Sequence, residues 1–239
     1  TNETLEGIAQ ALFQSWFIDF DPVRAKVEGN STGLPTEINE LFPDSFKDSE
    51  LDAIPNGWEV KQLGELIDLA YGKPLKASDR TPGSYPVFGS NGVVGSHNKY
   101  LIKGPGIVVG RKGNPGIVKW SNEDFYPIDT TFYVQPKSYI RHMTFLFFAL
   151  SHQRLADISA DSAVPGLNRN IAYMNQQVVP SSSLLNLFEE HVKQLFDRIA
   201  LNNLEILSLQ KLRDSLLPKL ISGELRINDA EKMLEKVNI

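Results

Sequence analysis

The sequence predicts a mixed α+β fold, in which a domain with a curved, glycine-rich β-sheet is followed by one long α-helix that forms a coiled-coil-like spacer. Two observations support this prediction. Residues 58–183 contain short β-branched runs separated by Gly, Pro and Asn, which is the punctuation of strands and tight turns. Residues 184–217 carry apolar side chains three and four positions apart, without Gly or Pro, which is typical of a helix that pairs with another helix.

Residues 1–25 begin with a predicted helix that has a strongly apolar and aromatic face. Its apolar positions follow helical spacing and are Leu5, Ile8, Ala9, Leu12, Phe13, Trp16, Phe17 and Phe20. Asp21-Pro22 is expected to end the helix, because the residue before a proline avoids the α region. Since the apolar face starts at the first residues, the natural polypeptide is expected to continue upstream.

Residues 26–57 are expected to form an extended connector. Pro35, Pro43 and Pro55 interrupt it, and its acidic residues outnumber its basic ones. Four apolar residues along the connector indicate that it lies against the domain, and these are Ile38, Leu41, Phe42 and Phe46.

The domain at residues 58–183 contains one clear hairpin signal. The runs IVVG and GIVKW flank Lys112–Gly116, which is predicted to form a tight turn. A short helix is expected at about residues 143–158, followed by a loop that carries Asn168, Arg169 and Asn170.

In the long helix, eight positions are expected to form the seam that contacts a partner helix. They are Phe188, Val192, Leu195, Ile199, Asn202, Ile206, Leu209 and Leu216. Asn202 is polar within this seam and is interpreted as a register-setting residue. Asn186 with Glu189 predicts the N-terminal cap and Pro218 the stop, which leaves residues 218–239 as a C-terminal tail.

About 32 residues at about 1.5 Å each make a rod of roughly 48 Å, which cannot bury its own seam. The expected partner is the N-terminal helix or its symmetry mate. The alternative is that the segment is a long core helix of an ordinary domain.

The overall charge of −5 argues against a general nucleic-acid binder, but the charge is unevenly distributed. Residues 58–183 hold 13 Lys/Arg against 9 Asp/Glu, a net of +4, whereas the rest of the chain carries −9. Such a basic middle is compatible with one module that faces phosphates. The absence of cysteine excludes disulfides and thiolate metal sites, and no apolar run approaches the roughly 20 residues of a membrane span. A cytoplasmic location is therefore expected.

No catalytic or metal-binding motif is present. The glycines form neither a phosphate-binding loop nor a dinucleotide fingerprint, there is no GxSxG elbow, and the four histidines lack metal-ligand spacing. One enzymatic alternative stays open. Asp44, Glu59 and Lys61 loosely match the acid pair and lysine of metal-dependent nucleases, in which the carboxylates hold Mg²⁺.

A second pattern consists of Lys, Arg and Asn residues in glycine-rich loops, where a backbone can approach a ligand closely. Arg and Lys pair with guanine edges or phosphates, and Asn pairs with adenine. The candidate DNA-binding residues are Asn91, Lys99, Arg111, Lys112, Asn114, Lys119, Asn168 and Arg169. The alternative is that the cations solubilise turns and the asparagines satisfy turn backbones.

Several stretches resemble, in order, the specificity subunit of type I restriction–modification systems. NETLEGIAQALFQSWFIDFDPVRAK resembles its central conserved region, and ELFPDSFKDSELDAIPNGWEVKQLGEL resembles the lead into its second target recognition domain. YPVFGSNGVVGSHNKYL, GIVVGRKGNPGIVKW and DFYPIDTTFYV resemble the core of such a domain, and PGLNRNIAYMNQQVVP its closing segment. LRDSLLPKLISGELRI resembles the distal conserved region. The chain departs from the family at VVPSSSLLNLFEE, where two prolines and a glutamine commonly precede the helix.

The resemblance implies a non-catalytic subunit that binds double-stranded DNA at one half of a bipartite target. It also implies scaffolding of methyltransferase (modification) subunits and a restriction (motor and nuclease) subunit. S-adenosylmethionine, ATP and Mg²⁺ are then expected only on those partners, with no cofactor or metal in this chain. Because the family normally has two recognition domains, this chain is expected to be the C-terminal half of a subunit or a half-subunit that forms a homodimer. A pure assembly module is a further alternative.

Overall fold

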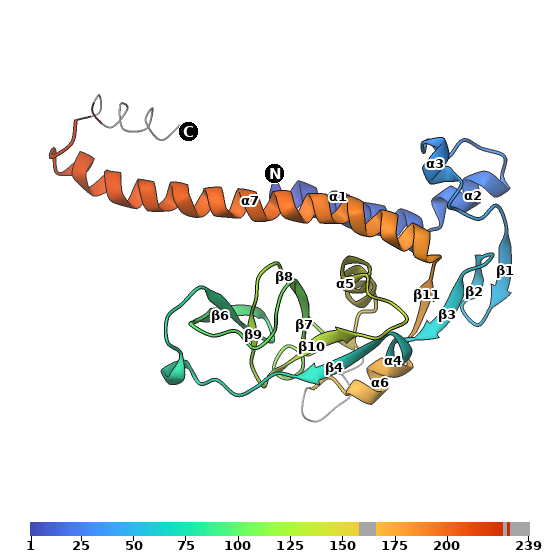
Figure 1. Cartoon of the computed structure of the whole chain (residues 1–239), viewed down its shortest axis with the longest axis horizontal. Helices are drawn as coiled ribbons and strands as arrows, with labels where there is room; N and C mark the ends of the chain where they lie inside the picture. Colours follow the sequence, from blue (N-terminus) through green and yellow to red (C-terminus); the bar gives the residue numbers. More distant parts are fainter. Residues whose placement is uncertain (158–165, 227–228, 230–239) are drawn as a thin grey trace.

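The computed structural model describes residues 1–157, 166–226 and 229. It contains a mixed α+β domain with several small sheets and one long helix, α7, that runs above the domain (Figure 1). The predicted fold class is therefore confirmed. In the part of the chain that the structure describes, no helix is both long and apolar enough to cross a membrane. Most of the tail after residue 226 lies outside the described residues.

The long helix α7 spans Ser182–Ile221 and is longer than predicted at both ends. Its 40 residues correspond to about 60 Å at 1.5 Å per residue. The Ser181 hydroxyl accepts a hydrogen bond from a first-turn N–H at 3.4 Å, so Ser181 is the N-cap and the prediction of Asn186 was wrong. Pro218 lies inside the helix. It does not stop the helix there, because this stretch is exposed and water can satisfy the carbonyl group that proline leaves unbonded.

The two residues that were predicted to cap α7 instead fasten it to helix α5 (Met143–His152). The Glu189 carboxylate accepts hydrogen bonds from the Thr144 N–H at 3.2 Å and the Thr144 hydroxyl at 2.7 Å. Asn186 contacts the His142 ring at 2.8 Å. Both partners lie more than 40 positions away in the sequence, so a local capping rule does not detect them.

Helix α1 (Asn2–Phe17) packs antiparallel along the first half of α7 (Figure 1). Near the start of α1, the Asn2 side chain accepts a hydrogen bond from Asn202 at 2.7 Å and donates one to Asn203 at 2.8 Å. Near its end, the Trp16 ring lies 6.2 Å from the Phe188 ring. The N-terminal helix is therefore the partner of α7, as predicted.

The predicted seam of α7 divides at Asn202. Before it, the seam side chains are buried or pack against the core, and these are Phe188, Val192, Leu195 and Ile199. After it, where α1 no longer runs alongside, the seam side chains are exposed or half-buried, and these are Ile206, Leu209 and Leu216. The first four positions thus lie in the core beside α1, and the pairing role of the seam as a whole stays a prediction.

The chain after α1 is more regular than the extended connector predicted for residues 26–57. Asp21-Pro22 begins helix α2 in addition to following α1, because proline is well tolerated in the first turn of a helix. The elements here are α2 (Asp21–Val27), α3 (Thr36–Asn39), β1 (Phe46–Ser49) and β2 (Asp52–Pro55). Phe42 is buried, and its ring lies 5.1 Å from that of Trp16, so this segment does lie against the core.

The α+β domain follows from residue 59 onward. Its elements are β3 (Glu59–Gln62), α4 (Leu63–Leu66), β4 (Ile67–Tyr71), η1 (Ala77–Asp79), β5 (Tyr85–Gly89), β6 (Gly92–His97), β7 (Gly106–Gly110), β8 (Val118–Ser121), β9 (Tyr126–Pro127), β10 (Thr131–Pro136), α5, α6 (Arg169–Met174) and β11 (Gln176–Val179). The hairpin predicted around Lys112–Gly116 is confirmed, because β7 and β8 pair antiparallel on either side of it. Helix α5 is shorter than predicted and ends at His152.

The strands form several small sheets, and the single curved sheet of the prediction is corrected accordingly. The largest has the order β4-β10-β7-β8 and is antiparallel throughout. Beside it lies the sheet β6-β5-β9, and two-stranded pairs join β11 to β3 and β1 to β2. The β5–β6 ladder shifts register between Val87 and Phe88, and such a bulge bends a strand away from a continuous sheet.

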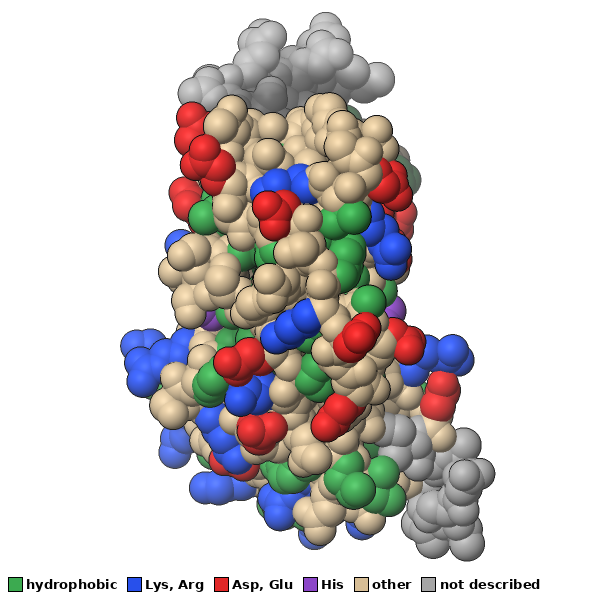
Figure 2. Space-filling model, turned by 90° about the vertical axis from the view of Figure 1, so that its right-hand side faces the viewer, with side chains coloured by type: hydrophobic (Ala, Val, Ile, Leu, Met, Phe, Trp, Pro, Cys, Tyr) green, Lys and Arg blue, Asp and Glu red, His purple; other side chains and the backbone are tan. Residues whose placement is uncertain are grey.

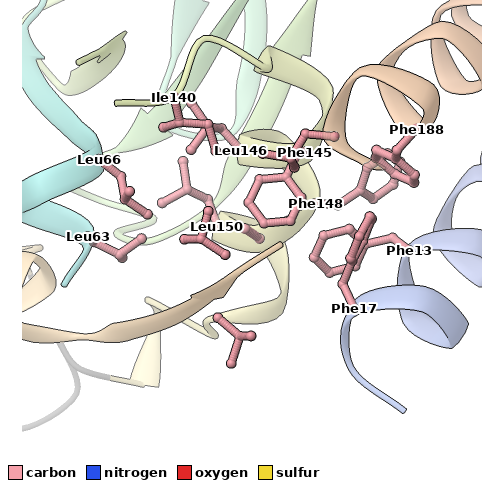
Figure 3. Close-up of a cluster of buried hydrophobic side chains, with 14 of the residues drawn as sticks. Phe13, Phe17, Leu63, Leu66, Ile140, Phe145, Leu146, Phe148, Leu150 and Phe188 are labelled. Carbon is pink, nitrogen blue, oxygen red and sulfur yellow. The ribbon is translucent and has the colours of Figure 1, made fainter. Parts of the chain in front are cut away.

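One apolar core joins the domain to helices α1 and α7 (Figure 3). Phe17 of α1 is 1% exposed, and its ring lies 5.0 Å from that of Phe188 on α7 and 5.3 Å from that of Phe145 on α5. Phe13 lies 5.6 Å from Phe148. Aromatic side chains contribute the largest buried apolar areas of any residues. Because three separate segments share these rings, packing fixes the position of α7 relative to the domain.

Candidate nucleic-acid interface

The predicted turn between β7 and β8 lies directly against the tip of the β5–β6 hairpin. A Cβ atom on Gly110 would lie 2.1 Å from the Asn114 carbonyl oxygen and 2.9 Å from the Ser90 carbonyl oxygen, so only glycine allows this approach. Gly113 has a φ of +81° and lies next to the Ser90 hydroxyl. Asn91, at the hairpin tip, is exposed beside this turn.

Lys119 reaches the same hairpin tip from β8. Its side chain lies 3.8 Å from the position that a Cβ atom would take on Gly92. Lys119 is exposed. The β7–β8 turn and Lys119 of β8 therefore both lie next to the tip of the β5–β6 hairpin.

A third segment, residues 166–169, joins the β7–β8 turn through the backbone. The Leu167 N–H donates to the Arg111 carbonyl oxygen at 2.9 Å, and Lys112 forms a β-bridge with Gly166. These bonds place Asn168 and Arg169 beside the turn, although they are more than 50 positions further along the chain.

Seven of the eight predicted DNA-binding residues therefore lie on adjoining loops or on strand β8 and the start of helix α6 beside them. We call this set the basic loop cluster, and its members are Asn91, Arg111, Lys112, Asn114, Lys119, Asn168 and Arg169. Lys99 lies apart, beyond the other end of β6, next to the contact between the Tyr85 and Tyr100 rings. Among the described residues, the four cations of the cluster form no ion pair, so their charge is available to an anion.

Hydrogen bonds along one edge of its guanidinium group, formed by Nε and Nη2, hold Arg111 in place. Its Nε and Nη2 donate to the Asp129 carbonyl oxygen at 3.1 and 2.6 Å. The same group lies 5.2 Å from the centroid of the Tyr71 ring, as a cation–π contact. Since this edge is already bonded, what Arg111 offers a ligand is its charge and remaining donors, which suit a phosphate.

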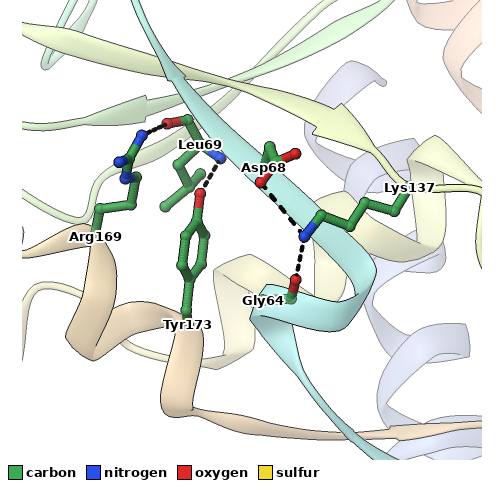
Figure 4. Close-up of polar contacts among 6 residues, drawn as sticks. All are labelled: Gly64, Asp68, Leu69, Lys137, Arg169 and Tyr173. Atoms are coloured by element: carbon green, nitrogen blue, oxygen red, sulfur yellow. Dashed lines mark hydrogen bonds and ion pairs between the residues drawn. The ribbon is translucent and has the colours of Figure 1, made fainter.

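The guanidinium of Arg169 also forms a cation–π contact with Tyr71, 5.2 Å from the ring centroid, and it lies 5.9 Å from the Tyr173 centroid. Its Nη1 donates to the Leu69 carbonyl oxygen at 3.4 Å, and the Tyr173 hydroxyl accepts a hydrogen bond from the Leu69 N–H at 2.7 Å (Figure 4). Asn168 caps the helix that begins here, because its side-chain oxygen accepts from the Asn170 N–H at 3.0 Å.

The sequence analysis missed Tyr71, which contacts two arginines and is 52% exposed. Strand pairing brings it there. Tyr71 is opposite Phe132 on β10, and Phe132 is opposite Val109 on β7, two residues before Arg111. The only signal in the sequence is a tyrosine at the end of a β-run, just before Gly72.

Charge is distributed over the surface as the sequence suggested. In the end-on view of Figure 2, Lys and Arg side chains gather along the lower margin, which belongs to the α+β domain. This is the segment whose net charge is +4. A positive margin of this kind raises the local concentration of polyanions.

The residues of the nuclease alternative have other partners. Lys61 lies 3.2 Å from the Glu59 carboxylate, and the Tyr139 hydroxyl donates to that carboxylate at 2.7 Å. These two hydrogen bonds lower the pKa of Glu59, and the bond to Glu59 raises the pKa of Tyr139 to about 12. Asp44 accepts from the Ser45 hydroxyl. In the part of the chain that is described, His, Asp and Glu form no group of three or more suited to a metal ion.

A small α+β domain that groups amides with cations lacking an ion pair to any described residue, and that packs against a long paired helix, defines a candidate nucleic-acid-recognition module. Residues 55–180 match the family described as the type I restriction modification DNA specificity domain. The match covers more than half of the chain, so the chain belongs to this family. The resemblance seen in the sequence is confirmed, and the family is that of a specificity component, not a catalytic one.

Two similar relatives are specificity subunits. The chain is 27% identical to the type I restriction enzyme HindI specificity subunit of Haemophilus influenzae, over 94% of this chain and 62% of that one. It is also 27% identical to the MjaIX specificity subunit of Methanocaldococcus jannaschii, over 95% of this chain and 54% of that one. The chain thus spans little more than half the length of these relatives.

A solved structure shares the fold. The type I restriction-modification S subunit from M. genitalium superposes with a TM-score of 0.59 at 18% identity, over 92% of this chain and 56% of that one. At this identity the likeness shows the fold alone.

Proposed function

We propose that this chain recognises double-stranded DNA by sequence, as part of a type I restriction–modification complex, and reads one half of a bipartite target. The basic loop cluster is the observation that carries the proposal. It places Lys and Arg side chains that form no ion pair with a described residue beside exposed Asn residues, close to glycines that let a ligand approach the backbone. These are the side chains that contact phosphates and base edges in DNA complexes.

The remainder of the chain is proposed to act as scaffold and spacer. Residues outside 58–183 carry a net charge of −9, and the second half of α7 exposes apolar side chains such as Leu204 and Leu207. Such a surface suits protein partners, here the methyltransferase subunits and the restriction subunit. A second recognition domain, in the same chain or in a homodimer, would read the other half-site. Catalysis, with S-adenosylmethionine, ATP and Mg²⁺, belongs to the partners.

The test is a selection from a random-sequence duplex library with the chain assembled with its methyltransferase subunits. One sequence is expected to be enriched. On that duplex, the Lys112→Ala/Lys119→Ala variant is expected to bind more weakly. The slope of log K against log salt concentration should fall by about 0.9 for each phosphate contact that is lost.

The matched control is Lys193→Ala/Lys211→Ala, which removes two exposed lysines from α7 and is expected to leave the slope unchanged. If no sequence were enriched over the random pool, sequence-specific recognition would be wrong and the chain would be an assembly module. An unchanged slope in the Lys112/Lys119 variant would remove these two lysines from the interface.

A further inference from the structure

We propose that Arg169 is a specificity-determining residue that reads a guanine edge, and that Tyr71 is the positioning residue that holds its guanidinium group. The inference rests on the proposed function of DNA recognition and names one base contact within it. Both residues lie at the basic loop cluster, where Tyr71 contacts Arg169 and Arg111 at 5.2 Å each.

The backbone of Arg169 is fixed in position. Arg169 is the first residue of α6, and the Asn168 side chain caps this helix by accepting from the Asn170 and Ile171 N–H groups. One turn later, the Tyr173 hydroxyl accepts a hydrogen bond from β4 at 2.7 Å (Figure 4). A base-reading side chain discriminates best when its main chain cannot shift to fit a wrong base.

Two aromatic rings and one long hydrogen bond hold the guanidinium group of Arg169. It lies 5.2 Å from the Tyr71 centroid and 5.9 Å from the Tyr173 centroid. Its one hydrogen bond to a described residue is the 3.4 Å bond from Nη1 to the Leu69 carbonyl oxygen. A cation–π contact holds a guanidinium in place without using its N–H donors, which leaves these donors for bidentate recognition.

The two arginines on Tyr71 differ in which donors are already bonded. Arg111 uses Nε and Nη2 on the Asp129 carbonyl oxygen. The Nε of Arg169, in contrast, is enclosed and has no hydrogen-bond partner among the described residues. A ligand would therefore meet Arg169 at Nη1 and Nη2, where the one bond to a described residue is the long one at 3.4 Å.

The chemistry of that edge favours guanine over the other bases. A planar guanidinium with two coplanar donors matches the O6 and N7 acceptors of guanine, which is the commonest specific contact between proteins and DNA. Lysine keeps the charge but lacks the fork, so it serves as a phosphate contact. Arg111, with its edge bonded, is assigned to a phosphate.

The experiment repeats the library selection on the assembled complex with five variants: Arg169→Lys, Arg169→Ala, Tyr71→Phe, Tyr71→Ala and Arg111→Lys. The selected site is expected to contain a guanine whose preference over other bases falls about 5- to 150-fold in both Arg169 variants. Tyr71→Ala should relax the same position while the salt slope stays unchanged, because no charge is removed. Tyr71→Phe should retain the parent preference for guanine at this position, because the aromatic ring remains.

A modified base gives a direct readout of the contact. Replacing that guanine by 7-deazaguanine removes the N7 acceptor. It is expected to weaken binding by the parent complex and to have no further effect on the Arg169→Ala variant. The matched control is Arg111→Lys, which should keep the preference at every position. Thermal unfolding of each variant checks that it is folded, and Arg169→Lys keeps the charge and stem should Arg169→Ala fail to fold.

Three results would overturn the inference. The selected site could lack guanine, Arg169→Lys could retain the parent preference at every position, or 7-deazaguanine could weaken the parent and Arg169→Ala equally. In each case the parent complex still enriches a sequence, so the proposed function stands. A parent complex that enriches no sequence would instead contradict the proposed function itself.

Discussion

Single side chains in this protein differ in how far their polar groups are already satisfied. The Asn168 oxygen caps α6, and the guanidinium edge of Arg111 is bonded to a backbone carbonyl. Lys112 and Asn114 are exposed, and no side-chain bond to either is among the described contacts. A bonded group contributes to stability, whereas an unbonded one remains able to bind a ligand. This difference ranks the members of the basic loop cluster, which their residue types alone do not.

Tyr139 supplies a prediction at the same scale. Its hydrogen bond to Glu59 raises the pKa of Tyr139 from 10.0 to about 12. Because the folded pKa is raised, the stabilisation is fully present below pH 10 and is lost as the pH rises through about 12. In Glu59→Gln the Tyr139 pKa is expected to return toward 10.

The measurement is the tyrosinate absorbance of the chain minus that of Tyr139→Phe, followed with pH. At low pH the same hydrogen bond acts through Glu59, and its stabilisation is lost as the pH falls. The pKa of Glu59 is lowered from 4.5, so its contribution is present above that value and is lost as the pH falls through the folded pKa. A difference titration with its midpoint near 10 in the parent chain would contradict the hydrogen bond.

At the scale of elements, sequence patterns located most helices and strands but not the contacts between them. The seam of α7, the hairpin at Lys112–Gly116 and the N-terminal helix all follow from local periodicity and turn chemistry. The true start of α7 does not, because Asn186 and Glu189 are engaged by α5, 44 and 45 positions away. Tyr71 likewise joins the site only through two successive strand pairings.

Pairing between α1 and α7 gives a prediction for Asn202. Its side chain donates to Asn2 at 2.7 Å within an otherwise apolar seam, and a polar pair of this kind fixes register at some cost in stability. Asn202→Leu is expected to leave the helices paired or more stable but to broaden their relative register. The chain has no cysteine, so spin labels on Glu6→Cys and Lys211→Cys report one distance distribution.

That distribution should be narrow in the parent chain and broader in Asn202→Leu. Gln194→Leu serves as the control, since it adds the same leucine at an exposed position of α7 and should leave the distribution narrow. Equal widths in the parent and Asn202→Leu would mean that apolar packing alone sets the register.

At the scale of the whole molecule, one core couples the basic loop cluster to α7. The sheet that carries the β7–β8 turn, helix α5 and the α1–α7 pair all pack into the same set of buried side chains. In the proposed function α7 separates two half-site readers, which requires that the domain keep a fixed orientation on α7. The shared aromatic rings supply that rigidity, and they account for the strongly aromatic face of α1 that the sequence shows.

Phe17→Ala tests this coupling. Phe17 is 1% exposed and contacts rings on α5, α7 and the start of the domain, so its truncation is expected to cost about 3–5 kcal/mol in the free energy of unfolding. Unfolding is followed by far-ultraviolet circular dichroism, which is dominated by α7, and by tryptophan fluorescence. Because the core is shared, both signals should show the same unfolding transition, and Phe17→Ala should shift both to milder conditions together. Ile8→Ala, on the same helix but 50% exposed, should shift the transition far less. Two separate transitions, with the tryptophan transition unmoved by Phe17→Ala, would show that α7 and the domain unfold independently. The core would then not hold the domain in a fixed orientation on α7.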